Sequence, residues 1–297
     1  MLYNGGMGSW REWEIKSVKI SDKEYPELLK KIKNPPDRLY YRGKWKRDLF
    51  KNCLAVVGAR KMTRYGEGVV EKLVSELVQA RVTIVSGFMY GVDTKAHEVC
   101  IKNGGKTIAV FGSGLNQVTP AGNDKFYTKV LESGGLVVSE YEAEMQARLW
   151  TFPQRNRIVA GLSKGVLVIE GGEKSGSLIT AKLGLKQGKK IMAVPGPVDS
   201  SMAKATNWLI KSGAVMVTTA EEILKELGLV GETVKKEEIV GLSKLESQIV
   251  EELKRESLGV DELARRLNKD VVEVSQIVSL MSVKGLIKEY VGKYMLG

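Results

Sequence analysis

Glycine-rich turns that follow short apolar runs are the parts of this sequence best suited to bind a charged ligand. The first turn, Gly58-Ala59-Arg60, lies between the apolar run 54–57 and an amphipathic stretch that follows Thr63. Backbone N–H groups at a helix amino terminus bind phosphate, and an arginine can add a bidentate contact. An ordinary strand-to-helix turn with a solvated arginine is the alternative, so this motif alone leaves the phosphate interpretation open.

Two further segments have the same character. Gly112–Gly114 follows the apolar run 107–111, but it lacks the third glycine of a dinucleotide fingerprint. In Gly171–Ser177, two glycines precede serines that could open a helix and complete an anion site. The Gly-Lys-Ser/Thr ending of a nucleoside-triphosphate loop is missing there, so we expect no triphosphate chemistry.

Charged and aromatic side chains add candidates. Arg155 and Arg157 flank Asn156 ahead of an apolar helical stretch, where one arginine could meet a phosphate and the other a carboxylate. A charged cap with an internal salt bridge is the alternative. Phe126, beside Lys125, could stack on unpaired bases, although apolar packing of its own helix competes with that interpretation.

The single histidine, His97, lies four residues after Asp93, so the two would share one face of a helix. Two ligands are too few for a zinc site, and we expect Asp93 to cap the helix with His97 packed nearby. The sequence has no Gly-x-Ser-x-Gly turn and no second histidine, so a hydrolase triad lacks its parts. We expect no catalytic residue, no metal and no cofactor.

Six short apolar runs would position these turns, and helical stretches such as 66–80 separate them. Unbroken apolar runs of this length are typical of strands covered on both faces, and hence of a parallel sheet. The pattern predicts a doubly wound α/β fold that binds ligands at the carboxyl ends of its strands. The runs are 54–58, 83–87, 107–112, 136–140, 166–170 and 190–194.

The chain divides into four parts. Residues 1–50 form an aromatic and basic lead-in, which we expect to pack on the α/β domain of residues 51–228. Residues 229–242 have the glycine and charge content of a linker. Residues 243–297 contain three helical patterns and a short hairpin pattern, which predict a small C-terminal winged-helix domain.

Charge and hydropathy narrow the class of protein. The formal net charge of +11 points to a polyanionic partner, although solubility alone could explain it. The residues from 243 onward are neutral, so the excess lies before them. No apolar run reaches the ~20 residues of a membrane span, and the first ten residues lack the pattern of a signal peptide. We expect a cytoplasmic protein in which Cys53 and Cys100 are buried thiols.

The succession of these segments, from about residue 25 to 225, resembles the DprA/Smf family of DNA-processing proteins. Each motif is weak alone, but their order is specific. The matching segments are Val57–Arg60, Ser86-Gly87, Gly91–Asp93, Ala96-His97, Gly112–Gly114, Pro120–Asn123, Ser139–Tyr141, Phe152-Pro153, Arg155–Ser163, Ser175–Ala181, Ala193–Gly196, Asn207, Leu209-Ile210 and Gly213-Ala214.

The resemblance implies an extended Rossmann-like domain that binds single-stranded DNA in a basic pocket, forms a homodimer and catalyses no reaction of its own. It also implies transfer of the strand to a RecA-type recombinase, in natural transformation or recombination. With the motifs above, the predicted nucleic-acid-binding residues are Gly58, Arg60, Gly112, Ser113, Gly114, Lys125, Phe126, Arg148, Arg155, Asn156, Arg157, Gly171, Gly172, Ser175 and Ser177.

This chain also departs from the family pattern. Tyr90 stands where the family usually has arginine, which removes one expected phosphate contact; we hypothesise that it supplies stacking instead. Thr119 replaces an aromatic residue, and Ala205 replaces a glycine.

Two other functions compete with this one. A Rossmann-like nucleotide phosphoribohydrolase would share the fold, but its threonine and catalytic glutamate are missing from the segment 170–176. A regulator that binds duplex DNA through the winged helix is the second alternative.

Overall fold

The computed structural model describes residues 9–229, 243–283, 286–290 and 292–296, which fall into two compact units divided after residue 234. The expected linker, 229–242, lies outside the described residues except for Leu229. That leucine is buried in the core of the first unit. The boundaries of the linker therefore stay a prediction.

A nine-stranded sheet forms the centre of the first unit. Its seven strands from β3 to β9 run parallel, β2 is antiparallel to β6, and β1 is antiparallel to β2. The doubly wound parallel sheet is thus confirmed, and the first 50 residues add two antiparallel strands to it. The spatial order is β1 (Lys16–Lys19), β2 (Arg38–Gly43), β6 (Leu136–Ser139), β5 (Thr107–Val110), β4 (Thr83–Ser86), β3 (Cys53–Val57), β7 (Gly165–Val168), β8 (Lys190–Ala193) and β9 (Val215–Met216).

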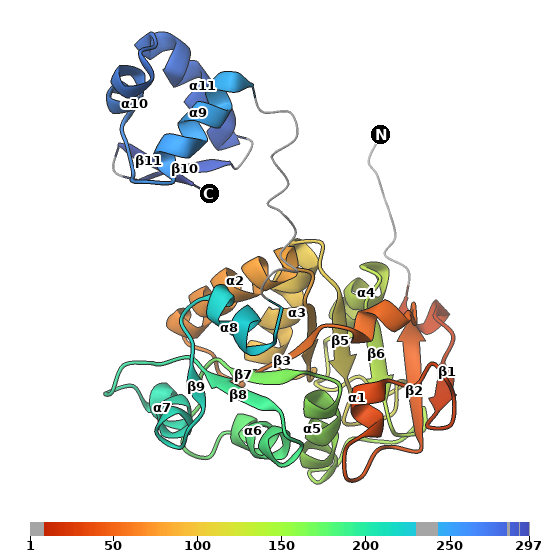
Figure 1. The fold of residues 1–297 in the computed structure, drawn as a ribbon. Helices are drawn as coiled ribbons and strands as arrows, with labels where there is room; N and C mark the ends of the chain where they lie inside the picture. The colour runs from red at the N-terminus through yellow and green to blue at the C-terminus, as the bar shows by residue number, and fades with distance from the viewer. Residues whose placement is uncertain (1–8, 230–242, 284–285, 291, 297) are drawn as a thin grey trace. The chain divides into compact units, whose positions relative to one another are not determined.

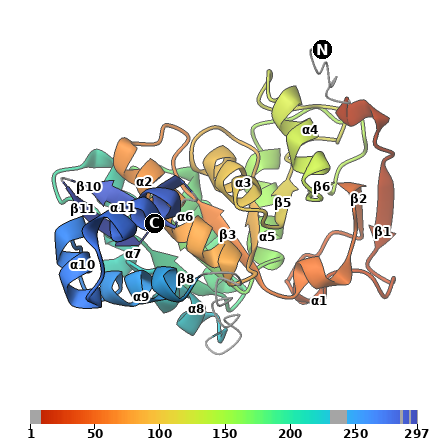
Figure 2. The same cartoon turned by 90° about the horizontal axis from the view of Figure 1, so that it is seen from above.

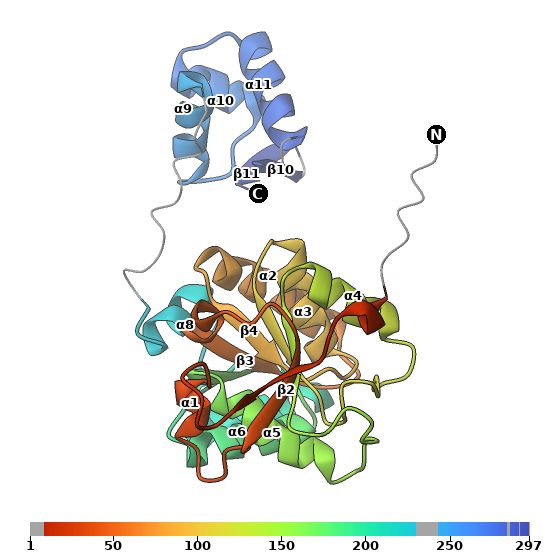
Figure 3. The same ribbon diagram turned by 90° about the vertical axis from the view of Figure 1, so that its right-hand side faces the viewer.

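Helices cover both faces of this sheet (Figure 1). One face packs against α2 (Arg64–Gln79), α3 (Val92–Lys102), α4 (Asp124–Glu132) and α8 (Ala220–Glu226). The other face packs against α1 (Glu27–Lys30), α5 (Thr151–Gly161), α6 (Gly176–Lys186) and α7 (Lys204–Lys211). Figure 2 shows α2 and α3 lying side by side, and Figure 3 looks onto the edge that β1 and β2 form. Single-turn 3₁₀ helices occur at η1 (Trp10–Glu12), η2 (Arg47–Phe50) and η3 (Ser201–Ala203).

The central strand β3 explains the unbroken apolar runs. Cys53, Ala55 and Val57 face the core beneath α5 and α6, while Leu54 and Val56 face the core beneath α2 and α3. All five side chains are buried, because both faces of the sheet are covered. From β3 the chain winds outward to β6 on one side and then returns to β7 on the other. The carboxyl ends of β3 and β7 therefore form the topological switch point, where such sheets bind ligands.

The second unit has its own small core. Helices α9 (Lys244–Leu253), α10 (Val260–Leu267) and α11 (Val271–Val283) precede an antiparallel pair, β10 (Ile287–Tyr290) and β11 (Lys293–Leu296). Buried leucine, isoleucine, valine and methionine side chains from these elements pack together. The element order is the one expected for a winged helix, and the winged-helix assignment itself stays a prediction. No helix in the described parts of the chain is both long and apolar enough to cross a bilayer.

Candidate nucleic-acid interface

A cavity of about 630 Å³ opens at the switch point of the sheet. The carboxyl end of β3, the turns after β3, β4 and β7, and the first turns of α5 and α6 line it. The structure therefore brings together motifs that are more than 100 residues apart in the sequence. The predicted site residues that line the cavity are Gly58, Arg60, Arg155, Asn156, Gly172, Ser175 and Ser177.

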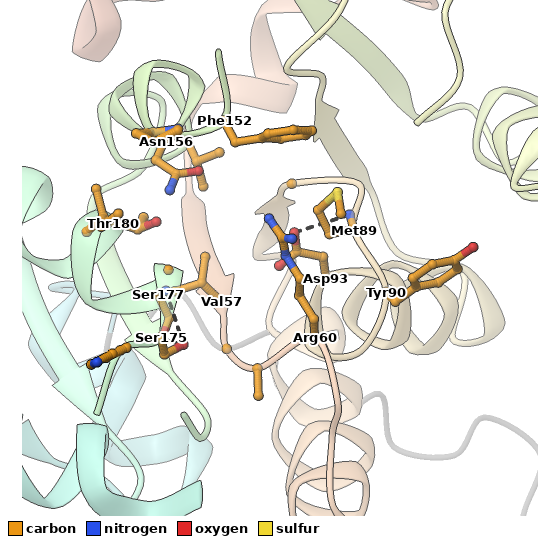
Figure 4. Close-up of a pocket in the computed structure, with 18 of the residues that line it drawn as sticks. Val57, Arg60, Met89, Tyr90, Asp93, Phe152, Asn156, Ser175, Ser177 and Thr180 are labelled. Carbon is orange, nitrogen blue, oxygen red and sulfur yellow. Dashed lines mark hydrogen bonds between the residues drawn. The ribbon is translucent and has the colours of Figure 1, made fainter. Parts of the chain in front are cut away.

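The two sides of the cavity differ in chemistry, as Figure 4 shows. One side presents Asn156 and hydroxyl groups at the start of α6, where Ser175 is the N-cap and its Oγ accepts a hydrogen bond from the N–H of Ser177 at 3.3 Å. The opposite side presents Arg60, whose guanidinium carbon lies 5.6 Å from the ring centre of Phe152. An anion between them would meet a helix amino terminus and a guanidinium group together.

Arg155 forms the floor of the cavity. Its side chain is 4% exposed, and its Nη1 donates to the carbonyl oxygen of Val110 at 2.5 Å, at the end of β5. Burial lowers the pKa of the Arg155 guanidinium and raises the pKa of the Asp93 carboxyl, while the opposite charge of each partner counteracts both shifts. A Cβ at Gly87 would come within 2.2 Å of Arg155 Nη1 and of Asp93 Oδ2, so only glycine fits there.

An internal carboxylate occupies the amino terminus of α2, the first phosphate site that the sequence suggested. Glu170 Oε1 accepts the N–H of Thr63 at 2.7 Å, and Oε2 accepts the Thr63 hydroxyl at 2.6 Å. A Cβ at Gly66 would lie 2.5 Å from the Glu170 carboxyl carbon. Glu170 thus holds the N-cap residue of α2, and α6 is the helix whose amino terminus lines the cavity. Gly58 and Arg60 line the cavity, and phosphate binding at the α2 end of this turn stays a prediction.

The other glycine loop does not reach the cavity. Gly112 packs on Phe152, Ser113 is buried and donates to the Gln117 carbonyl oxygen, and Gly114 fits against the carbonyl oxygens of Glu142 and Ala143. The loop therefore supports the residues that line the cavity. Any contact of this loop with nucleic acid stays a prediction.

Several other predicted residues also lie outside the cavity lining. Phe126 is half-buried and stacks on Phe88 with ring centres 5.4 Å apart, while Lys125 and Arg148 are exposed. Gly171 packs closely against Ser175, since a Cβ at Gly171 would lie 2.8 Å from Ser175 Oγ. The predicted residues outside the lining are Gly112, Ser113, Gly114, Lys125, Phe126, Arg148, Arg157 and Gly171.

Arg157 forms an internal salt bridge, which is the alternative that the sequence left open for this pair of arginines. Its Nη2 lies 2.5 Å from Glu140 Oε2, and both side chains are largely buried. Burial raises the pKa of Glu140, and the Arg157 charge opposes that shift. Of the two arginines, Arg157 forms a salt bridge with Glu140, and Arg155 lines the cavity near the Asp93 carboxylate.

His97 is a structural residue. Its Nε2 lies 2.7 Å from the Gly87 carbonyl oxygen and its Nδ1 lies 2.6 Å from the Thr107 hydroxyl. Burial lowers the pKa of His97 to about 4. Asp93 lies in the first turn of α3 and accepts the Met89 N–H at 3.4 Å. In the described parts of the chain, no group of three or more His, Cys, Asp or Glu side chains could hold a metal ion.

Sequence reasoning missed several lining residues. Lys61 and Lys174 line the cavity beside Arg60 and Ser175, and their position next to two glycine turns was the available signal. Tyr90, for which the sequence suggested stacking in place of the family's arginine, is 52% exposed at the cavity, and its hydroxyl donates to the Ala121 carbonyl oxygen at 3.2 Å.

Comparison with known proteins decides the family. The model of the family described as DNA recombination-mediator protein A matches residues 16–228. This chain belongs to that family. Among curated relatives of this DprA-family chain, Protein Smf of Escherichia coli is 40% identical over 73% of this chain and 58% of its own length. DNA processing protein DprA of Bacillus subtilis is 38% identical over 74% of each chain.

Solved structures agree with this membership. DNA processing protein A of Streptococcus pneumoniae superposes with a TM-score of 0.67 at 38% identity, over 72% of this chain and 74% of that protein. The Helicobacter pylori protein, whose structure was solved for its single-stranded DNA binding mode, gives a TM-score of 0.65 at 27% identity over 74% of this chain and 98% of its own. The match of this DprA-family chain to the family model ends at residue 228, within the first unit.

Proposed function

We propose that this DprA-family chain binds single-stranded DNA in the cavity at the switch point, and that it passes the strand to a RecA-type recombinase without catalysing a reaction. The charge of the cavity lining carries the proposal. Its charged side chains are four cations, Arg60, Lys61, Arg155 and Lys174, and one acid, Asp93. A cavity with this charge at a switch point attracts a phosphate chain.

In the proposed binding mode, some residues of the cavity bind the phosphate and others stack on the bases. Arg60 and the amino terminus of α6 hold one phosphate group between them, and Arg155 Nε is a buried donor without a partner in the described chain. Tyr90 is half exposed at the cavity, and its ring offers a face on which bases stack with little discrimination between sequences. Binding of this type weakens with salt, by a slope of about −0.7 for each phosphate neutralised.

The residues at the cavity do not favour the hydrolase alternative. The acid at the cavity, Asp93, contacts the Met89 N–H and lies against the Arg155 guanidinium, so it is held as a structural partner. Glu170, which follows β7, caps α2. Release of a free base from a nucleoside monophosphate would contradict the non-catalytic function.

We also propose that the chain forms a homodimer through the edge of the sheet at β9 and the adjacent α7. Trp208 is 49% exposed and Met216 is 54% exposed, and both line one shallow apolar groove. A two-residue edge strand with exposed apolar neighbours is a surface that a second copy would cover. Sedimentation of the wild type and Trp208→Glu tests this, and a dimer that persists in the variant would contradict it.

The decisive test compares Arg60→Ala with Arg64→Ala. Both arginines are exposed and four residues apart, but only Arg60 lines the cavity. We expect Arg60→Ala to weaken single-strand binding at least about tenfold and to make the salt slope shallower, while Arg64→Ala binds like the wild type. Fluorescence anisotropy with matched single- and double-stranded oligonucleotides measures both effects. Equal affinity for both forms, or equal loss in both variants, would move the function away from the cavity.

A further inference from the structure

Cations gather at the edge of the sheet opposite the cavity. The six connections that lead into the parallel strands β3 to β8 contain no Asp or Glu, and those into β3, β4, β5, β7 and β8 each contain one cation. Because these strands are parallel, the five cations lie along one edge. With neighbouring strands about 4.8 Å apart, the row spans about 20 Å. Its members are Lys51, Arg81, Lys106, Lys164 and Lys189.

The edge that holds the cavity is less basic than this row. The connections that leave the same six strands carry more acids than cations, so the basic excess of the first unit is not concentrated there. Their cations are Arg60, Lys61, Arg148 and Lys174, and their acids are Glu140, Glu142, Glu144, Glu170, Glu173 and Asp199.

The segment 44–52 extends the row. Strand β2 ends at Gly43 beside Leu136, the first residue of β6, and the chain then crosses the same edge to reach β3. The contact of Asp48 with Lys106 at 2.6 Å places the segment beneath β5. This pair is more than half exposed on both sides, so it neutralises the edge weakly.

Aromatic side chains alternate with the cations of this segment. Lys44, Lys46 and Arg47 are exposed, and the half-buried rings of Trp45 and Phe50 pack with their centres 4.8 Å apart. Aromatic rings between lysines are typical of surfaces that bind unpaired nucleic acid. We call the set Lys44, Lys46, Arg47, Lys51, Arg81, Lys106, Lys164 and Lys189 the amino-end surface.

Positive charges also lie near one another beside this surface. Lys189 is half-buried, and burial together with the nearby Lys31 charge lowers its pKa. Lys164 donates to the neutral amide oxygen of Asn52 at 2.8 Å, so that contact leaves its charge uncompensated. A bound polyanion would relieve this repulsion.

We propose that the amino-end surface binds the phosphate backbone of single-stranded nucleic acid, as a second site separate from the cavity. The proposal extends the proposed function, since the same strand can serve both sites. Strand β3 has five residues, so the two edges lie about 17 Å apart, a distance that a few nucleotides cover. Cations near the carboxyl ends of α2, α3, α5 and α6 are also favoured by the helix dipoles, which makes the row compatible with the fold.

The test neutralises three exposed cations, Lys44→Gln, Lys46→Gln and Arg81→Asn, in the full chain. Asn is chosen at position 81 because the backbone there has a φ of 58°, which Asn tolerates. The control makes the same change of charge at Lys269, Lys288 and Lys293, which are exposed in the second unit and are not part of the nine-stranded sheet. Binding is measured over a salt series with oligothymidylates of about six and about thirty nucleotides.

We expect the triple variant to bind the long strand about tenfold more weakly than the control, with a salt slope shallower by about 2, while the short strand binds both equally. Equal long-strand affinity in the two triple variants would overturn the second site. The second site would also be overturned if the triple variant lost binding only to anionic lipid vesicles and not to the long strand, since the surface would then bind a membrane. A wild type that binds neither oligonucleotide would instead refute the proposed function. Arg60→Ala, measured on the short strand, distinguishes a failure of the cavity site from a failure of the amino-end surface.

Discussion

At the scale of single residues, burial changes what a polar side chain can do. The Gly87 carbonyl oxygen only accepts hydrogen bonds, so the bond to His97 requires a proton on Nε2. Nδ1 lies 2.6 Å from the Thr107 hydroxyl oxygen, which itself donates to the Ile84 carbonyl oxygen at 2.9 Å. The same histidine would titrate near pH 6.5 in the unfolded chain, whereas in the fold its pKa is about 4. His97 therefore links the packing beneath the cavity to pH.

This linkage predicts a loss of stability in mild acid. Between pH 6.5 and 4 the unfolded chain binds a proton at His97 that the folded chain does not, so the free energy of unfolding falls as pH is lowered through this range. The full loss in the free energy of unfolding amounts to roughly 3 kcal/mol, and above pH 6.5 the protonation of His97 no longer affects stability. Urea unfolding of the wild type and His97→Gln at several pH values measures it. The variant should show a flatter dependence, and parallel curves would contradict the assignment.

Residue types predicted the cavity only in part. The sequence identified Arg60 and the serines at the start of α6, because glycine turns after apolar runs mark strand ends, and Arg155, because it flanks Asn156 ahead of an apolar helical stretch. It could not show that Glu170 fills the α2 amino terminus, since Glu170 and Thr63 are 107 positions apart. Nor could it tell which of Arg155 and Arg157 forms the salt bridge, because that depends on the position of Glu140 in another segment.

At the scale of elements, a single buried guanidinium joins the N-terminal segment to the glycine loop. Arg42 lies on β2 and is 5% exposed. Its Nε donates to the Trp13 carbonyl oxygen, its Nη1 to the Leu115 carbonyl oxygen and its Nη2 to Asn116 Oδ1, at 2.7–2.8 Å. The lead-in is therefore fastened to the loop that supports Phe152, and the order of apolar runs gave no sign of this contact.

Removal of that guanidinium should loosen the loop. In Arg42→Met the carbonyl oxygens and the amide lose their charged donor, which costs about 3 kcal/mol of stability. Hydrogen exchange should quicken at residues 112–117 in particular. Arg38→Met on the same strand is the control, since Arg38 is exposed and lies 5.8 Å from the ring centre of Tyr40. Equal protection of the loop in both variants would show that Arg42 does not hold it.

At the scale of the whole molecule, the chain consists of two compact units with separate apolar cores. Apolar runs and turns predicted the parallel sheet well, because both of its faces are buried and local sequence reports that directly. Formal charge predicted a basic first unit but not its distribution, since only the strand order reveals that Lys51, Lys106 and Lys164 share an edge.

The division into units predicts that the first unit carries the strand binding. A chain that ends at residue 229 keeps the cavity and its complete sheet, and it loses a segment with no net charge from residue 243 onward. We expect its affinity for single-stranded DNA to stay within about threefold of the full chain. Anisotropy measured side by side tests this. A drop of tenfold or more, or a preference of the full chain for duplex DNA that the truncation abolishes, would assign binding to the second unit.

Glu170 also affects which phosphate-containing ligands the cavity favours. A nucleoside triphosphate presents three linked phosphates and needs several converging N–H groups, yet one of the two helix amino termini at the β3–β7 switch point already has this carboxylate bonded to its N-cap residue. A DNA strand presents its phosphates singly, and in the proposed binding mode the amino terminus of α6 holds one of them. We therefore expect ATP to compete weakly with a DNA strand for the cavity, a selectivity that would come from the carboxylate beside α2.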